Sequence, residues 1–278
     1  MKQQIYLSLI DIQPSLLNYS QAISPMLKTF VINLDRSPQR LSIVNERAER
    51  VSLDVERVAG INGRELDLTI LAEVDVRGYQ HWHGKRLNPN EVGCYLSHIK
   101  AMRAFLLSEA EYGLILEDDA DFPDDFHSLL QTLISVNAHW DIVKLSSFHS
   151  GTPIPIESLD GMRKLAVPLS GHMNANSILY NRKAAARLIE KLLPMRLPFD
   201  HALERAWLFG LKLRVVSPSP CPADTGLPSD IGYTENFKFP IYKRLGCFCF
   251  RARTELLRVL FGLFHVVRHK ILLGTSDR

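Results

Sequence analysis

Acidic side chains crowd the end of one apolar run near the middle of the chain. Residues 113–126 read GLILEDDADFPDDF, so Glu117, Asp118, Asp119 and Asp121 follow directly on that run. In an α/β sheet, ligands bind beyond the carboxyl ends of the strands, and a buried strand is expected to end here. Carboxylates held together repel one another unless they share a cation, and Mn²⁺ or Mg²⁺ relieves that repulsion and also grips a diphosphate. This is the chemistry needed to hold a nucleotide-diphosphate sugar and to neutralise its diphosphate as it leaves.

Three other interpretations of this acidic stretch stay open. A merely solvated loop is the main one, because acidic loops commonly follow strands. A calcium loop of the EF-hand type is poorly supported: counted from Asp119, the sixth position is Asp124 rather than Gly and the twelfth is Leu130 rather than Glu. An aspartyl nucleophile of the phosphatase type would need partners that the neighbouring sequence does not offer.

The elements that must position these residues alternate between strand and helix. Apolar runs and helical spacings predict strands over 28–35, 53–60, 112–119 and 140–147, and helices over 37–53, 88–112 and 126–137. Ser37-Pro38 is a good helix start, since Pro suits the first helical position. A loop or hairpin is expected over 151–162, and 64–87 reads as irregular. The alternation predicts an α/β domain with a largely parallel sheet.

The helix over 88–112 carries a few polar residues on an otherwise apolar sequence. Gly93 is costly early in a helix, which hints at a close approach of another backbone. Ser97 and His98 are adjacent, and neighbours on a helix point about 100° apart, so they cannot form a catalytic relay by themselves. His98 is either a structural histidine or a residue that contacts the substrate. Cys94 is expected in the core.

Composition excludes some classes of function. The chain has 278 residues, 46% hydrophobic and 23% charged, and its net charge of +3 is too small to argue for nucleic acid binding. The spacing of the four cysteines fits no zinc site, and we expect reduced thiols: Cys94, Cys221, Cys247 and Cys249. Residues 1–26 are expected to be an N-terminal extension without a signal peptide. These features predict a cytoplasmic protein.

The last forty residues differ from the rest in charge. Between Lys238 and Lys270 there are eight Lys or Arg residues and one acid, Glu255, with Leu, Phe, Val and Ile between them. The stretch FRARTELLRVLFGLFHVVRHKILL has its apolar residues at helical spacing. Such a helix can lie on an anionic bilayer or dock on the protein's own core. A basic amphipathic tail is therefore expected over 237–278.

Three motifs in order resemble glycosyltransferase family 25. They are FVINLDRSPQR near the start, NEVGCYLSHIKAM in the middle and LILEDDADF after it, and the likeness extends over residues 28–205. The family contains lipooligosaccharide glycosyltransferases of bacteria and galactosyltransferases that modify collagen. The resemblance implies a GT-A-like nucleotide-diphospho-sugar transferase fold. It also implies an inverting, usually metal-dependent transfer, often of galactose from UDP-galactose.

The resemblance suggests roles for the acidic residues. GT-A enzymes commonly carry an acidic-any-acidic motif, which maps onto Glu117-Asp118-Asp119, with Glu117 near the ribose and Asp119 on Mn²⁺ or Mg²⁺. The competing register is Asp119-Ala120-Asp121, in which Asp121 also binds the metal. Asp119 belongs to both registers.

The first motif is expected to line the nucleotide pocket. Three polar residues would lie at the end of the first strand: Asn33, Asp35 and Arg36. Arg40 lies about one helical turn further on. A planar guanidinium can donate two hydrogen bonds to a diphosphate, which favours Arg40 as a donor ligand. A surface ion pair with Glu46 or Glu49 is the alternative for Arg40.

A later segment supplies the candidate base. SGHMNANSILYN resembles a family segment in which Asn174, Asn176 and Ser177 would face the donor or acceptor sugar, although MNANS departs from the usual Gly-Thr or Gly-Ser. Asp200 is the candidate general base, since an inverting transfer needs a group that takes the proton of the acceptor hydroxyl. A helix N-cap is the alternative role for Asp200, and Asp230 is a fallback base.

The combined hypothesis divides the chain into 1–26, a GT-A-like domain over 27–236, and the tail over 237–278. It predicts the transfer of a hexose, most simply galactose, from a UDP-sugar to a saccharide of lipooligosaccharide, with localisation in the cytoplasm and on the inner face of the cytoplasmic membrane. A binding module of the same fold without turnover is the alternative. A nucleotidyl- or phosphotransferase is a weaker rival, because the Gly-rich phosphate loop with Lys and Ser/Thr is missing.

Overall fold

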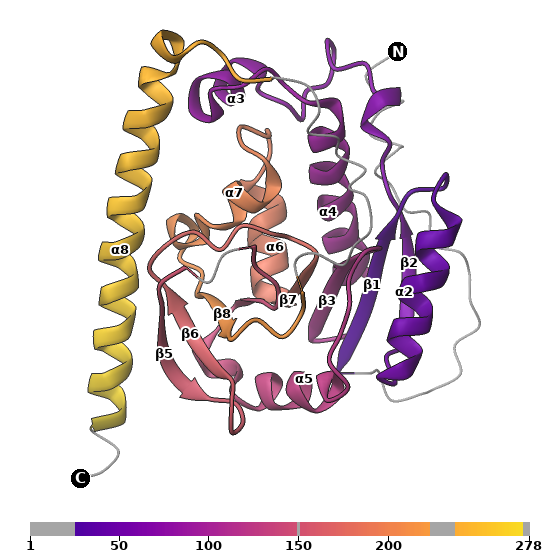
Figure 1. Cartoon of the computed structure of the whole chain (residues 1–278), viewed down its shortest axis with the longest axis vertical. Helices are drawn as coiled ribbons and strands as arrows, with labels where there is room; N and C mark the ends of the chain where they lie inside the picture. Colours follow the sequence, from indigo (N-terminus) through magenta and orange to yellow (C-terminus); the bar gives the residue numbers. More distant parts are fainter. Residues whose placement is uncertain (1–25, 149–150, 223–236, 275–278) are drawn as a thin grey trace.

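One eight-stranded sheet organises the protein (Figure 1). The structure, a computed structural model, describes residues 26–148, 151–222 and 237–274. The predicted N-terminal extension, apart from its last residue, and the fallback base Asp230 lie outside the described residues. The strands are β1 (Leu27–Asn33), β2 (Val55–Ala59), β3 (Tyr112–Glu117), β4 (Ile142–Lys144), β5 (Pro153–Ser158), β6 (Lys164–Pro168), β7 (Ser177–Asn181) and β8 (Leu213–Ser217).

Seven α-helices accompany the sheet in the described residues. They are α2 (Pro38–Arg50), α3 (Val76–His83), α4 (Pro89–Leu107), α5 (Phe126–Ser135), α6 (Arg182–Lys191), α7 (Phe199–Leu203) and α8 (Leu245–Gly274). The α/β class and the C-terminal helix are as the sequence predicts. Within the described residues, no helix combines the length and the apolar character that crossing a bilayer requires.

The expected largely parallel sheet was wrong, because the sheet is mixed. Its order is β2-β1-β3-β7-β4-β8-β6-β5, in which β1 pairs in parallel with β2 and β3, and β4 with β8. The strand β7 runs antiparallel between β3 and β4, and β6 runs antiparallel to β8 and β5. The apolar run of a buried strand is the same in either direction, so the sequence pattern carried no information on the direction of β7.

The parallel part of the sheet brings three strand ends to one edge. Asn33 at the end of β1 is paired with Ala59 at the end of β2, and Ile32 is paired with Glu117 at the end of β3. Parallel strands have their carboxyl ends on the same side, so the loops that follow β1, β2 and β3 meet there. The acidic stretch and the NLDRSPQR turn are therefore neighbours in space.

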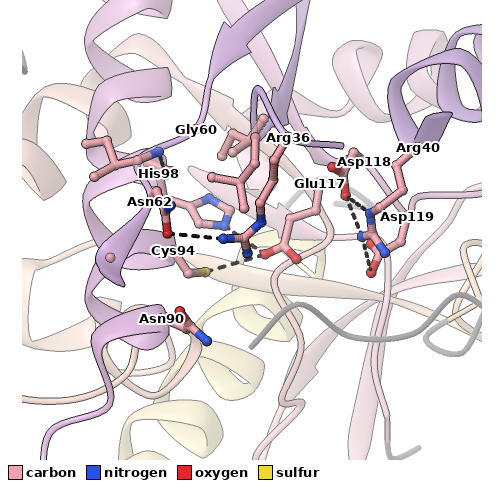
Figure 2. Close-up of a pocket in the computed structure, with 15 residues that line it drawn as sticks. Arg36, Arg40, Gly60, Asn62, Asn90, Cys94, His98, Glu117, Asp118 and Asp119 are labelled. Carbon is pink, nitrogen blue, oxygen red and sulfur yellow. Dashed lines mark hydrogen bonds and ion pairs between the residues drawn. The ribbon is translucent and has the colours of Figure 1, made fainter. Parts of the chain in front are cut away.

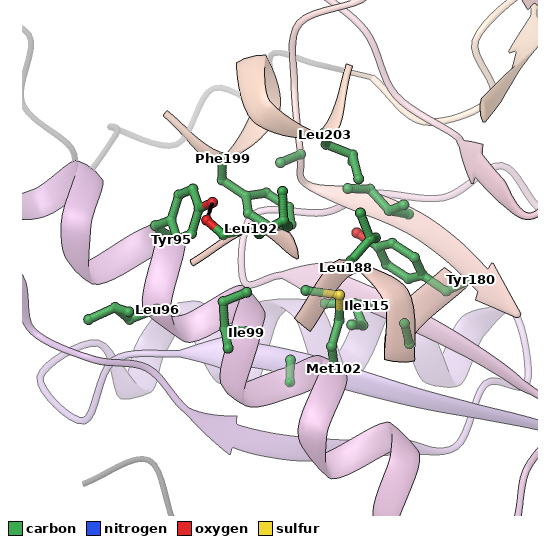
Figure 3. Close-up of a cluster of buried hydrophobic side chains, with 14 of the residues drawn as sticks. Tyr95, Leu96, Ile99, Met102, Ile115, Tyr180, Leu188, Leu192, Phe199 and Leu203 are labelled. Atoms are coloured by element: carbon green, nitrogen blue, oxygen red, sulfur yellow. Dashed lines mark hydrogen bonds between the residues drawn. The ribbon is translucent and has the colours of Figure 1, made fainter. Parts of the chain in front are cut away.

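Two apolar cores cover the two faces of the sheet. On one face, Ile99 and Met102 of α4 share a core with Ile115 of β3 and Tyr180 of β7, and Tyr95 packs on Phe199, as Figure 3 shows. The other core contains the buried side chains of α2 and α5. The helix α4 thus lies directly over the strands whose ends form the shared edge.

The sequence reading missed α3, which lies inside the stretch expected to be irregular. Both ends carry standard helix signals: the Asp75 side chain accepts a hydrogen bond from the Gly78 amide at 2.8 Å, and Gly84 ends the helix with a φ of 73°. The next helix, α4, is capped by Asn88, whose side chain accepts a hydrogen bond from the Asn90 amide at 3.0 Å.

Gly93 of α4 has the close backbone neighbour that its position in the helix suggests. A Cβ at Gly93 would lie 2.5 Å from the Ile61 carbonyl oxygen and 2.6 Å from the Gly63 nitrogen. The loop after β2 therefore rests on the first turns of α4. Ser97 completes the contact, since its hydroxyl accepts a hydrogen bond from the Ile61 amide at 2.8 Å.

Candidate active site

A cleft of about 660 Å³ opens at the edge where β1, β2 and β3 end. This volume includes the solvent-filled mouth of the cleft. Six of the predicted residues line it: Arg36, Arg40, His98, Glu117, Asp118 and Asp119. Figure 2 shows Arg36 of the β1–α2 turn and Arg40 of the first turn of α2 facing the acidic residues at the end of β3, with α4 forming the opposite wall. The cleft therefore offers cations and carboxylates to one ligand.

The three consecutive acids have different partners. Asp118 is buried and accepts hydrogen bonds from Arg40 Nε at 2.7 Å and from Asn33 Nδ2 at 2.8 Å. Arg40 also approaches Asp119, with 3.4 Å between Nη2 and Oδ2. Arg40 thus pairs with the acidic stretch rather than with Glu46 or Glu49, and Asn33 supports Asp118 from behind.

Glu117 is tied to the α4 wall of the cleft. Its Oε1 lies 3.0 Å from His98 Nε2 and 3.8 Å from Cys94 Sγ. The ring of His98 is buried and stacks on Phe199 with 4.1 Å between the centroids. Burial opposes ionisation of Glu117, but the hydrogen bond and charge of His98 outweigh it, so the pKa of Glu117 lies below its usual range.

Asp119 is the acid that retains an unpartnered oxygen. Among the described residues, its Oδ1 is buried without a hydrogen-bond partner. Burial and then the charge of Glu117 raise the pKa of Asp119 to about 6. A divalent cation bound by Glu117 and Asp119 would relieve this repulsion, so these two carboxylates are the candidates to hold a hard ion such as Mn²⁺ or Mg²⁺.

A second group of potential metal ligands shares Glu117. Cys94, His98 and Glu117 each offer one ligand atom, and these atoms lie within 4.8 Å of one another. A thiol must lose its proton to bind a metal, but burial and then the charge of Glu117 raise the pKa of Cys94 well above its usual range. The neutral thiol therefore acts as a hydrogen-bond donor to Glu117.

Two predicted residues point away from the cleft. The side chain of Asp35 is 82% exposed, and its ion pair with Arg57 lowers its pKa. Asp121 lies 3.2 Å from Arg50 Nη2 and 3.7 Å from Arg47 Nε, on the outer side of the acidic stretch. Neither is among the residues that line the cleft, so the geometry favours the register Glu117-Asp118-Asp119.

Asn176 and Asp200 lie near the cleft without lining it. The main-chain oxygen of Asn176 accepts a hydrogen bond from the Glu117 amide at 2.8 Å, and its side chain donates to the Pro222 oxygen at 3.3 Å. Asp200 follows Phe199, which stacks on His98, and its charge contributes to the raised pKa of Cys94. Asp200 is not the N-cap of α7, because Pro198 holds that position.

The sequence reading missed the residues that the β2 loop and α4 supply. Gly60, Asn62 and Asn90 line the cleft, and Asn62 Oδ1 accepts a hydrogen bond from Arg36 Nη1 at 3.2 Å. Cys94 also lines the cleft, although it was expected in the core. Two signals were available: the loop follows a predicted strand, and Cys94 precedes His98 by one helical turn. The four cysteines are free thiols, as predicted.

Comparison with known proteins gives relatives that are named as glycosyltransferases. Procollagen galactosyltransferase 1-B of Xenopus laevis is 27% identical over 184 residues, which cover 63% of this chain and 30% of the relative. A protein of Rattus norvegicus named probable inactive glycosyltransferase 25 family member 3 is 28% identical over 145 residues, covering 49% and 25%. The chain therefore spans less than a third of the length of these relatives.

A solved structure with a similar arrangement is the mannosyltransferase of Pyrobaculum calidifontis in complex with GDP-Man and Mn²⁺. It covers 99% of this chain and 85% of its own, with 11% identity and a TM-score of 0.40. No assignment rests on a likeness of this size. The family model described as Glycosyltransferase family 25 (LPS biosynthesis protein) matches residues 26–203, in agreement with the motifs. Since this match covers well over half of the sequence, the chain belongs to glycosyltransferase family 25.

Proposed function

We propose that the chain is a glycosyltransferase that moves a hexose from a nucleotide-diphosphate sugar to a hydroxyl of a saccharide, with inversion. The observation that carries this proposal is one cleft in which Arg36 and Arg40 face Glu117 and Asp119 at the carboxyl ends of three parallel strands. Family membership supports the same reaction. We propose UDP-galactose as the donor and a saccharide of lipooligosaccharide as the acceptor.

The residues of the cleft suit the donor's diphosphate. The guanidinium groups of Arg36 and Arg40 would place two positive charges beside it, with Arg40 held in position by Asp118 and Asp119 and Arg36 by Asn62. A divalent cation held by Glu117 and Asp119 would supply positive charge against the charge that develops on the leaving diphosphate. The Asn33 and Arg40 hydrogen bonds to Asp118 keep this end of the acidic stretch in place.

Asp200 is the proposed general base. As the acceptor oxygen bonds to the anomeric carbon, the bond from that carbon to the diphosphate oxygen breaks and its electron pair leaves with the diphosphate. The proton of the acceptor hydroxyl passes to the Asp200 carboxylate. Attack from the face opposite the diphosphate inverts the anomeric centre.

A binding module without turnover is the second candidate. The observation in its favour is the relative from Rattus norvegicus that is named probably inactive. Such a module would bind the same donor through the same arginines but would not consume it. Binding and turnover must therefore be measured separately.

A panel of UDP-, GDP- and CMP-sugars, with and without Mn²⁺, tests both candidates. We expect calorimetric binding of a UDP-sugar that depends on Mn²⁺, together with slow release of free sugar in its presence. Asp119→Asn should lose the Mn²⁺-dependent binding, whereas Asp124→Asn, whose side chain is 94% exposed, should retain it. Binding without any turnover would favour the module, and binding of none of the sugars would reject both candidates.

A further inference from the structure

The helix α8 presents a continuous apolar stripe away from the rest of the protein. Six large apolar side chains between residues 256 and 271 of this helix are 46–61% exposed: Leu256, Leu260, Leu263, Phe264, Val267 and Ile271. Their spacings of three and four residues place them on one side of the helix, which we call the outer face. Figure 1 shows α8 standing at the margin of the molecule along its whole length. A helix on a soluble protein normally turns such a stripe toward the core.

The opposite, inner face of α8 already makes the contacts that hold the helix. Arg258 is buried and lies 3.5 Å from Glu204, and His269 Nε2 lies 2.7 Å from the Ile156 carbonyl oxygen. Phe261 stacks on Trp207 with 4.9 Å between the ring centroids. These contacts fix the rotation of the helix about its axis. The outward position of the apolar stripe is therefore set by the packing and is not the result of a loosely attached helix.

Positive charge borders the outer face. Arg253, Arg268 and Lys270 are exposed. The acid of this helix, Glu255, is engaged 2.7 Å from the buried Arg258 and does not offset them. An apolar stripe flanked by cations matches a membrane with anionic headgroups, where apolar side chains enter the acyl boundary and cations meet lipid phosphates. A purely apolar protein groove would give these cations no counter-charge.

We propose that the outer face of α8 binds the surface of an anionic lipid bilayer, with the helix axis parallel to the membrane plane. The stripe from Leu256 to Ile271 spans 16 residues of α8, so the contact is about 24 Å long. The proposal concerns where the protein works and does not depend on the proposed transfer reaction. Lipid binding and donor binding are separate measurements, so either proposal can fail alone.

Flotation of the full chain with vesicles tests the proposal. We expect binding to vesicles of phosphatidylethanolamine with phosphatidylglycerol, and much weaker binding to phosphatidylcholine alone. The variant Leu256→Ser, Leu260→Ser, Phe264→Ser should bind anionic vesicles at least about tenfold more weakly, because less apolar area is buried. Its matched control is Ile70→Ser, Leu107→Ser, Met162→Ser, which changes three apolar side chains that are 52–76% exposed elsewhere. The control should bind like the wild type.

A charge variant separates the two contributions. Each cation near an anionic surface strengthens binding by about fivefold. Arg253→Gln, Arg268→Gln, Lys270→Gln should therefore lose up to about a hundredfold in affinity for anionic vesicles, and added salt should weaken the wild type. The same exchange at Arg77, Arg187 and Lys191, exposed cations outside α8, should have little effect. Thermal unfolding midpoints should stay close to the wild type in all variants, since the exchanged side chains are exposed.

Two results would overturn the proposal. One is equal binding of the wild type and both α8 variants to anionic vesicles. The other is a concentration-dependent dimer in sedimentation without lipid, abolished by the apolar variant, because the outer face would then belong to a second copy of this chain.

Discussion

At the scale of single residues, the chemistry of the cleft depends on the different partners of three consecutive acidic side chains. Glu117 is held by His98, and Asp118 by Asn33 and Arg40. Only Asp119 keeps a buried oxygen without a described partner, and its pKa is raised to about 6. Burial and repulsion make Asp119 costly to ionise. A bound cation would therefore stabilise its ionised form strongly.

The pH dependence of donor binding should follow Asp119. Its carboxyl is protonated below pH 6, and a protonated carboxyl is a poor metal ligand, so metal binding should strengthen as the pH rises through 6. We expect Mn²⁺-dependent UDP-sugar affinity to fall about tenfold per pH unit below that value. Calorimetry between pH 5 and pH 8 measures this. The same profile in Asp119→Asn would assign the titration to another group.

The proposed base should affect turnover and spare donor binding. Asp200 does not line the cleft, so Asp200→Asn should leave the dissociation constant of the Mn²⁺–UDP-sugar complex unchanged. The transfer rate should fall by about 10²- to 10⁴-fold, the usual contribution of a general base. Single-turnover measurements with saturating donor give the rate, and circular dichroism checks the fold. Wild-type turnover in this variant would leave the base unidentified.

At the scale of elements, α4 and the loop after β2 form one wall of the cleft by direct backbone contact. Gly93 permits this contact, because the positions around it are occupied by Ile61 and Gly63 main-chain atoms. The Ser97 hydroxyl fixes the same loop through the Ile61 amide. The loop then places Asn62 beside Arg36.

Gly93→Ala should disturb both stability and the cleft. The added Cβ would overlap backbone atoms that cannot rotate aside, and overpacking of this kind costs about 1–3 kcal/mol. The higher helix propensity of Ala offsets up to about 1 kcal/mol of that cost. Urea unfolding measures the loss, and donor titration should show weaker binding. The control is Gly161→Ala, where a Cβ meets nothing within 4 Å and little change is expected.

At the scale of the whole molecule, one buried charge network joins three distant parts of the chain. Glu204, just after α7, lies 2.7 Å from Lys144 of β4 and 3.5 Å from Arg258 of α8. It also accepts a hydrogen bond from the His172 amide at 3.0 Å. Burial opposes ionisation of Glu204, but Lys144 and Arg258 outweigh it, so its pKa lies below the usual range. The carboxylate therefore fastens α8 to the central sheet.

Glu204→Gln should destabilise the protein in a pH-dependent way. Removing this charge leaves buried Lys144 without its ion-pair partner and leaves Arg258 with Glu255 alone, which costs about 3–5 kcal/mol near pH 7. A lowered pKa stabilises the fold above the unfolded value of about 4.3, and that stabilisation is lost as the pH falls through the folded value. The difference from wild type should thus shrink below pH 4.

Chemical unfolding at pH 7 and at pH 3.5 measures this difference. The matched control is Glu190→Gln, which removes a carboxylate from surface ion pairs with Arg187 and Lys191. Exposed pairs contribute little to stability, so the control should resemble the wild type at both pH values. If the control were as unstable as Glu204→Gln, the buried network would contribute no more to stability than a surface ion pair does.

The sequence by itself determined the parts that depend on local pattern. It predicted the order of strands and helices from β1 to β4, apart from α3, because side-chain periodicity and caps act within a few residues. It placed the acidic stretch at the end of a strand with Arg36 and Arg40 in the same pocket, and it left His98 open between a structural role and a substrate contact. It also indicated the close approach at Gly93, since a glycine early in a helix needs a reason.

Only the tertiary structure decided the rest. The direction of β7, the division of labour among Glu117, Asp118 and Asp119, and the entry of Asn62 and Cys94 into the cleft all depend on residues far apart in the chain. The outward turn of the apolar side of α8 depends on Arg258 and Phe261 finding partners on other elements. Periodicity specifies that a helix has two faces. Which face is buried follows from the free energy of packing against the whole molecule, and that free energy is not written in any one segment.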